Sequence, residues 1–190
     1  MIPTDLIGSS WLCYCVGIGG DISFDLELIR SYGATVRAFD PVAEYVEDAI
    51  DKADGEPSFF AYQAAIAERD GPVRMQVTHH EHSHSVSGAK LYDSKNYVEL
   101  PGRTLPSLMA ELGDERIDLL KLDVEGAEYE LIPTLDLRGF GVKIFSTQMH
   151  HTGSVRKARS LIARLKRDGY ELVGEKPAVK LTFAREELLS

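Results

Sequence analysis

The feature that most limits how this chain can fold is an apolar run that enters a glycine turn and leaves it as a helix. Residues 11–18 read WLCYCVGI, without the alternation of a half-exposed strand, and such a run is typical of a buried parallel strand. Beyond the glycines at 17–20, Ile22, Leu26 and Ile29 recur at the spacing of one helix face. These residues predict the first strand–turn–helix unit of an α/β fold.

The alternation of strands and helices continues to the end of the chain. We expect helices at 41–53, where Pro41 would take the first helical position, and at 105–113, 124–135 and 154–169. Strands are expected at 35–40, 58–66, 72–79, 116–123, 142–150, 170–176 and 178–185. This order predicts a doubly wound α/β sheet in a single domain, residues 1–190, with its ligand beyond the carboxyl ends of the strands.

Composition excludes some kinds of partner. The net charge of -9 opposes binding to nucleic acid or to a membrane surface, since both need a basic field. No apolar stretch reaches the length of a membrane span, and the first ten residues lack a signal-peptide pattern. Cys13 and Cys15 are the only cysteines, and their spacing inside a strand predicts buried thiols, with metal or redox use as the alternative. We therefore expect a cytoplasmic protein.

The glycine turn predicts a ligand that approaches the backbone closely. Gly17, Gly19 and Gly20 leave no side chains in its way. Asp40 ends the next predicted strand, 23 residues after Gly17, which is near the spacing of about 20 residues expected for a carboxylate that binds ribose hydroxyls. The ligand is therefore expected to contain a nucleoside.

The residues behind the turn separate two nucleoside ligands. A dinucleotide fingerprint would have a third glycine at position 22, where this chain has Ile22. Asp21 at the helix start would repel a pyrophosphate but would accept the ammonium group of S-adenosylmethionine. Asp21 can also serve simply as a helix cap, or do both.

A second motif, KLDVEGAE at 121–128, ends another predicted strand in Asp123. Asp123 should lie where the sheet places its ligand, and Lys121 points to the same side and is a candidate partner for its charge. Glu125 and Glu128 follow at a helix start, where acidic residues are also stabilised by the helix dipole. The motif thus indicates a functional role for Asp123, whereas each of the two glutamates can have either a functional role or a structural role at the helix start.

Together with GIGGD, AFDP and QMHH, this motif resembles the FkbM family of S-adenosylmethionine-dependent methyltransferases, over about residues 11–180. The resemblance implies a Rossmann-like, mostly parallel sheet of about seven strands with a C-terminal antiparallel hairpin, and mostly O-methyl transfer. The predicted cofactor-binding residues are Gly17, Gly19, Gly20 and Asp21 for the methionine part, Asp40 and Pro41 at the ribose, Gln63, Ala64 and Ala65 at the adenine, and Asp123 near the sulfonium.

Two departures from the family pattern concern the site. Cys15 and Val16 stand where many members carry an acidic residue, which Asp21 can replace, and Gln148 stands where a glutamate is expected. The chain begins almost directly at the first strand, so the acceptor site is expected to be open or completed by a second copy in a homodimer.

The sequence therefore predicts an S-adenosylmethionine-dependent methyltransferase that acts on a hydroxyl of a small molecule or sugar. Asp123, Glu125 and His150 are the predicted catalytic residues, with His150 as the base that takes the acceptor proton. The alternatives are a nicotinamide-dependent oxidoreductase and a nucleoside-binding module without catalysis.

We expect transfer to proceed without a metal ion. A histidine-rich run holds His79, His80, Glu81, His82 and His84, which together can bind zinc or nickel, but a polar loop is the preferred interpretation. Asp123, Glu125 and His150 are a second candidate set of ligands, for a divalent ion beside the acceptor.

Overall fold

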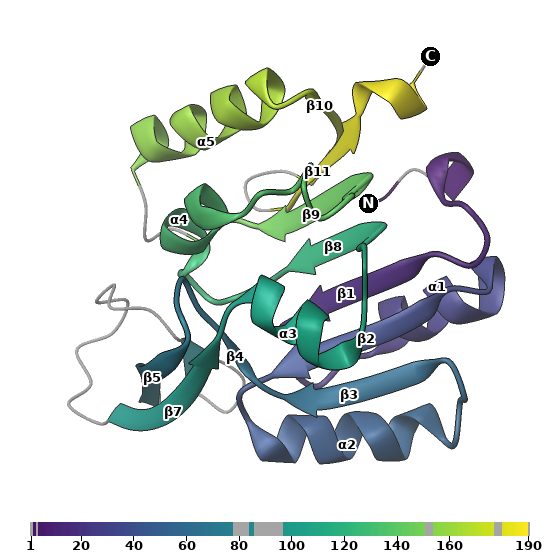
Figure 1. The fold of residues 1–190 in the computed structure, drawn as a ribbon, viewed down its shortest axis with the longest axis vertical. Coiled ribbons are helices and arrows are strands. Elements are labelled where there is room, and N and C mark those ends of the chain that lie inside the picture. The colour runs from purple at the N-terminus through teal and green to yellow at the C-terminus, as the bar shows by residue number, and fades with distance from the viewer. Residues whose placement is uncertain are drawn as a thin grey trace.

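A seven-stranded sheet forms the centre of the computed structural model, which describes residues 2, 4–77, 84–85, 97–150, 154–176 and 180–189 (Figure 1). Its strand order is β10-β11-β9-β8-β1-β2-β3. The strands are β1 (Leu12–Val16), β2 (Thr35–Asp40), β3 (Phe59–Gln63), β8 (Leu119–Leu122), β9 (Ile144–Gln148), β10 (Tyr170–Lys176) and β11 (Lys180–Arg185). The first five are mutually parallel, whereas β11 runs antiparallel to both β9 and β10. The predicted fold class is confirmed.

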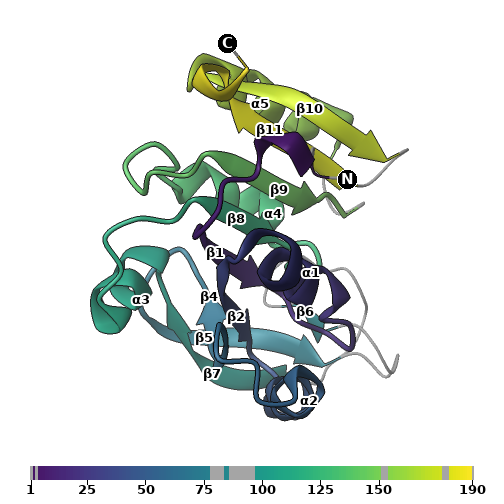
Figure 2. The ribbon, with the colours of Figure 1, turned by 90° about the vertical axis from the view of Figure 1, so that its right-hand side faces the viewer.

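Helices cover both faces of this sheet (Figure 2). One face carries α1 (Ser23–Tyr32) and α2 (Ala43–Ala53), and the other carries α3 (Leu105–Leu112), α4 (Glu128–Leu131) and α5 (Val155–Arg167). Short 3₁₀ turns lie at Thr4–Leu6, Ile132–Thr134 and Glu186–Leu188. In the part of the chain that the structure describes, no helix has the length and apolar character needed to cross a bilayer.

Alternation along β1 divides the core into two clusters. Tyr14 and Val16 pack toward α3, α4 and α5, whereas Cys13 and Cys15 pack toward α1 and α2. Both cysteines are at most 1% exposed and neither forms a disulfide, so the prediction of buried thiols is confirmed.

The ends of the first two helices are set by local chemistry. Gly33 ends α1 in the left-handed conformation, at φ 63°, and its N–H donates to Ile29 O at 2.8 Å. The second helix begins at Ala43, so the prediction that Pro41 would be its first residue is wrong. Val42 is its N-cap, and the Val42 N–H donates to the carboxylate of Asp40, which holds the chain extended before the helix.

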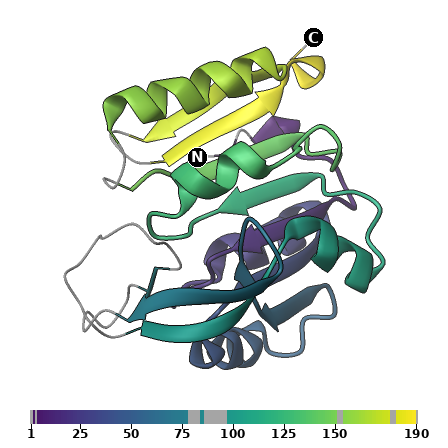
Figure 3. The same cartoon turned by 60° about the vertical axis from the view of Figure 1, so that its left-hand side comes forward.

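A second sheet lies beside the carboxyl ends of the central strands, and it was not predicted (Figures 1 and 3). It comprises β4 (Ala65–Ile66), β5 (Gly71–Val77), β6 (His84–Ser85) and β7 (Tyr97–Arg103), in the order β4-β7-β5-β6. The strand predicted at 58–66 breaks at Ala64. The Ala64 N–H makes a last bond to Asp40 O beside β2, and the chain then turns to pair with β7. The strand predicted at 72–79 is confirmed over 72–77 as β5, and residues 78 and 79 lie outside the described residues.

Most of the histidine-rich run lies outside the described residues, including His79, His80, Glu81 and His82. Of the polar loop predicted in this region, the structure describes the backbone of His84 and Ser85, which pair with β5.

Candidate active site

A cavity of about 270 Å³ lies at the carboxyl ends of the central strands. The switch in strand order between β1 and its two neighbours places it there, as expected for a doubly wound sheet. Its lining residues are Val16, Gly17, Ile18, Gly19, Gly20, Asp21, Asp40, Pro41, Tyr45, Ala64, Ile66, Lys121, Asp123, Val124, Glu125 and Lys180.

Asp40 fixes the glycine turn in place. One carboxylate oxygen accepts N–H bonds from Ile18 at 3.0 Å and Gly19 at 3.2 Å, and the other accepts from Val42 at 2.9 Å. Asp40 is 5% exposed, and charge-assisted bonds of this kind are stronger than neutral ones. The residue predicted to bind ribose thus also determines the shape of the turn.

The three glycine positions of the turn differ in the space that a side chain would have. Gly17 has a φ of 85°, and a Cβ there would lie 1.9 Å from the backbone oxygen of Asp123. At Gly19 and Gly20 a Cβ would meet nothing within 4 Å. Gly17 therefore lets β1 and β8 approach each other, whereas Gly19 and Gly20 leave open space in the wall of the cavity.

Asp21 and Lys121 have contacts that the sequence left open. Asp21 precedes Ile22, the N-cap of α1, and its carboxylate accepts the Ser23 N–H at 2.9 Å, which lowers the Asp21 pKa, while the residue also lines the cavity. Lys121, the candidate partner for the charge of Asp123, donates from Nζ to Gly17 O at 3.3 Å and acts on Asp123 through its charge rather than in a direct ion pair. Burial raises the Asp123 pKa, although the nearby charge of Lys121 opposes that rise.

The DVEGAE segment forms a tight turn before α4. Glu125 and Gly126 both have positive φ values, 49° and 106°, and the helix begins only at Glu128. The turn aims the N–H groups of Val124 and Gly126 at Glu128 Oε1, at 3.3 and 3.2 Å. Glu128 is fully buried, so it is part of the interior rather than an exposed acid at a helix start.

His150, two residues after β9, lies among these carboxylates. Its Nδ1 lies 2.8 Å from Glu128 Oε1, and its Nε2 lies 3.2 Å from Glu125 Oε2 and 3.9 Å from Asp123 Oδ1. Gln148 Nε2 is 3.1 Å from the same Nε2.

The charge state of the His150 ring bears on its predicted role. Burial lowers the pKa of His150, but the hydrogen bonds to Glu125 and Glu128 outweigh burial and raise the pKa to about 10. At neutral pH the ring of the metal-free protein therefore holds both protons. It cannot accept another, which argues against the predicted role of His150 as the base.

The structure brings most of the predicted site residues together. Those that line the cavity are Gly17, Gly19, Gly20, Asp21, Asp40, Pro41, Ala64, Asp123 and Glu125. His150 contacts Glu125 without being part of the lining, whereas Gln63 donates to Pro41 O on the exposed side and Ala65 is buried in β4. The binding roles of all these residues stay predictions.

Sequence reasoning missed Tyr45, Ile66 and Lys180 as cavity residues. Tyr45 is in the first turn of α2, directly after the AFDP segment, and that position was the available signal. Lys180 comes from β11, and no local pattern connects it with the glycine turn.

A glycine turn after β1, an acidic residue at the end of β2 and a seven-stranded sheet with β11 antiparallel between β9 and β10 are the features of the class I methyltransferase fold. The chain belongs to the FkbM methyltransferase domain family, whose model matches residues 15–172, and it is therefore a methyltransferase. A comparison with curated protein sequences finds no match.

Solved structures with this fold are distant in sequence. A fibrillarin pre-rRNA processing protein from Methanococcus jannaschii superposes with a TM-score of 0.55 at 11% identity, covering 97% of this chain and 70% of that one. A precorrin-6y C5,15-methyltransferase from Geobacter metallireducens gives 0.53 at 12% identity, covering 94% and 81%. A ribosomal protein L11 methylase from Lactobacillus delbrueckii gives 0.51 at 15% identity, covering 93% and 70%. These likenesses support the fold.

Proposed function

We propose that this methyltransferase uses S-adenosylmethionine, held in the cavity at the glycine turn, to methylate a hydroxyl group of a small molecule or sugar. The observation that carries the proposal is the joining, in one cavity, of bare backbone at Gly19 and Gly20 with the carboxylates of Asp40 and Asp123. The family supplies the reaction type, and the cavity supplies the reasons for this cofactor.

The charge of the cavity favours this cofactor over a dinucleotide. Its lining holds four acidic side chains and two lysines, namely Asp21, Asp40, Asp123, Glu125, Lys121 and Lys180. An excess of carboxylates attracts a ligand with sulfonium and ammonium groups and repels a pyrophosphate. Asp21 at the start of α1 acts in the same direction, so the nicotinamide-dependent alternative fits this cavity less well.

The shape of the cavity supports a particular placement of the parts of the cofactor. The methionine part would lie against Gly19 and Gly20, where no atom lies within 4 Å of a Cβ position. The ribose would meet Asp40, whose carboxylate is already held by backbone N–H groups and so loses little freedom on binding. Lys121 and Lys180 are the lining cations available to the carboxylate of the methionine part.

The reaction then needs alignment at the Asp123 end of the cavity. S-adenosylmethionine, when bound, supplies an electrophilic methyl group on a sulfonium. An acceptor oxygen forms a bond to the methyl carbon, the carbon–sulfur bond breaks with its electron pair left on sulfur, and the hydroxyl proton leaves to water. Asp123 and Glu125 border this end and would orient the acceptor hydroxyl, an effect that can contribute about 7–11 kcal/mol in well-aligned systems.

The proposed acceptor is small and neutral or cationic. With a net charge of -9 and acidic residues at the Asp123 end, the protein repels polyanions such as nucleic acids. Hydroxyl groups of small molecules and sugars have no such conflict with the site.

Calorimetry with S-adenosylhomocysteine, the demethylated product, and with NAD tests the cofactor. We expect the first to bind and the second not to. The Gly20→Leu variant should lose binding while its unfolding midpoint stays within a few degrees of wild type, because the new side chain enters open space.

Gly33→Ala is the matched control, since this glycine ends α1 at the opposite end from the turn and should leave affinity unchanged. Tight binding of NAD without S-adenosylhomocysteine, or wild-type affinity in Gly20→Leu, would show that the cavity is not the cofactor site.

A further inference from the structure

Three metal-ligating side chains meet beside the cavity. Asp123 follows β8, Glu128 begins α4 and His150 follows β9, and each brings one ligand atom to within 4.8 Å of the other two. Their separation along the sequence, up to 27 positions, means that the fold assembles the group. The ends of β8 and β9 and the start of α4 bring the three side chains together.

Two buried carboxylate oxygens in this group have no hydrogen-bond donor among the described residues. They are Asp123 Oδ1 and Glu128 Oε2. Glu128 is fully buried, and the three N–H groups that reach it all donate to its other oxygen, Oε1. Burying an anionic oxygen without a partner is costly, and buried charges in proteins are paired or coordinate metals.

The charges around His150 are also unbalanced. Its ring faces three carboxylates, those of Asp123, Glu125 and Glu128, and even a fully protonated imidazole carries one positive charge. The charges of Lys121 and Lys180 act on Asp123, but among the described residues no lysine or arginine nitrogen lies within 4.0 Å of the three carboxylates, and the other polar group at the ring is the neutral amide of Gln148. A divalent cation would supply the missing charge at the point where the unpaired oxygens lie.

We propose that Asp123, Glu128 and His150 bind a divalent first-row transition-metal ion. One imidazole and two carboxylates form a set of three protein ligands, which leaves further coordination positions open, as in catalytic rather than structural sites. His150 would bind the ion through Nδ1, which already lies 2.8 Å from Glu128 Oε1, so that the ring and this carboxylate meet at the ion. Glu125 Oε2, 3.2 Å from Nε2 on the other side of the ring, would hold the imidazole in this orientation.

This site differs from what the sequence led us to expect. The sequence favoured no metal and offered Asp123, Glu125 and His150 as the second choice of ligands, whereas the buried oxygen of Glu128 makes it the better third ligand. A metal here also removes the need for His150 as the base. It lowers the pKa of a hydroxyl beside it, so that the acceptor can release its proton to water. This catalytic role rests on the proposed function, but the binding of metal does not.

Manganese binding tests the site directly. Protein freed of metal by EDTA and desalting is titrated with Mn²⁺, and the loss of the free-ion signal is followed by electron paramagnetic resonance. We expect one Mn²⁺ per chain, and a higher unfolding midpoint when it is bound. Glu128→Gln, Asp123→Asn and His150→Gln should each weaken binding by about tenfold or more, because each removes a ligand.

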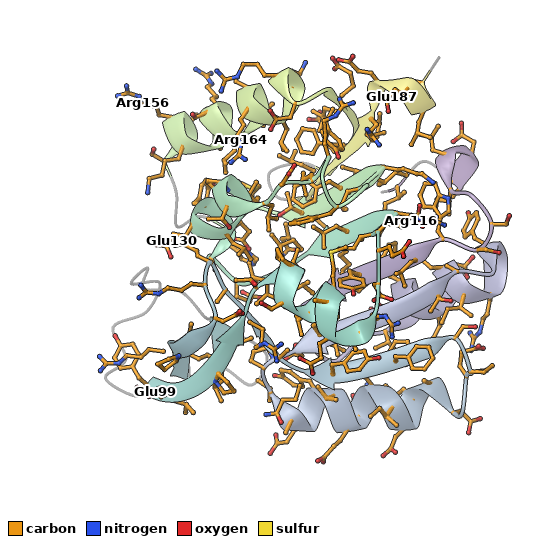
Figure 4. The ribbon with its side chains drawn as sticks, in the orientation of Figure 1. Glu99, Arg116, Glu130, Arg156, Arg164 and Glu187 are labelled. Carbon is orange, nitrogen blue, oxygen red and sulfur yellow. The ribbon has the colours of Figure 1, made fainter. Side chains whose placement is uncertain are left out.

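Glu130→Gln is the matched control, since Glu130 lies two residues from Glu128 on the same helix but is exposed on its outer side (Figure 4). It should bind Mn²⁺ like wild type. Absence of Mn²⁺ and Zn²⁺ binding at millimolar metal by wild type would overturn the proposal. So would wild-type affinity in Asp123→Asn and His150→Gln, which provide the test even where Glu128→Gln fails to fold.

Calorimetry with S-adenosylhomocysteine in EDTA separates this proposal from the proposed function. If S-adenosylhomocysteine binds but no metal does, the proposed cofactor site is supported and the proposed metal site is overturned. If metal binds but S-adenosylhomocysteine does not, the metal site is supported and the cofactor site is overturned.

Discussion

Gly17 allows two parallel strands to approach closely, and its replacement by alanine should destabilise the protein. A Cβ at this position would lie 1.9 Å from the Asp123 backbone oxygen, so the two strand ends must separate by more than about 1 Å to reach an ordinary contact. Overpacking of this kind costs about 1–3 kcal/mol, and a residue other than glycine at a φ of 85° adds about 1–2 kcal/mol.

Gly33→Ala separates these two contributions. Gly33 has a φ of 63° but nothing within 4 Å of its Cβ position, so its replacement incurs only the backbone cost. Urea unfolding of both variants should place Gly17→Ala at least about 1 kcal/mol below Gly33→Ala, with unfolding slopes equal to that of wild type. Equal stabilities would refute the claim that the contact between Gly17 and Asp123 determines the turn.

Three further predictions concern other parts of the molecule. Asp40→Asn should lower affinity for S-adenosylhomocysteine by about tenfold and weaken the turn, since it removes a charged acceptor of backbone N–H bonds, and unchanged affinity in calorimetry would contradict the ribose assignment. Burial raises the Cys13 pKa from 9.0 to about 12, so folding favours the protonated thiol. The stability that this thiol contributes is complete below pH 9.0 and is lost as the pH rises toward 12. Cys13→Ala should therefore reduce the loss of stability between pH 8 and pH 11, measured by urea unfolding. Ser154→Ala should lower the free energy of unfolding by about 1 kcal/mol, because the Ser154 hydroxyl accepts the Lys157 N–H at the start of α5, and an unchanged midpoint would remove this cap from the account.

The central sheet could be predicted because its inner strands are buried on both faces. A strand such as β8, with Leu119, Leu120 and Leu122 fully buried, reads as an apolar run that only Lys121 interrupts. The second sheet has no such signal. Its strand β7 reads YVELPGR, with Tyr97, Val98 and Glu99 exposed and Pro101 near its end, so neither alternation nor continuous apolarity marks it.

The candidate site also has a part that the sequence could predict and a part that it could not. Gly17, Asp40 and Asp123 were predictable, because each ends or follows a recognisable strand and the sheet rule brings such positions together. The contact of His150 with Glu128 was not predictable. It depends on the tight turn at Glu125 and Gly126, which delays the helix and sends Glu128 into the interior, and no periodic pattern in the sequence encodes that turn.

The central claim is that the glycine turn holds the methyl donor with its sulfur toward Asp123, and a crystal structure of the S-adenosylhomocysteine complex tests it most directly. The account predicts ribose hydroxyls within hydrogen-bond distance of the Asp40 carboxylate and the methionine part along Gly19 and Gly20. The sulfur should face Asp123 and the group formed with Glu128 and His150. A ligand found outside this cavity, or one bound with its adenine at Asp123, would contradict the account.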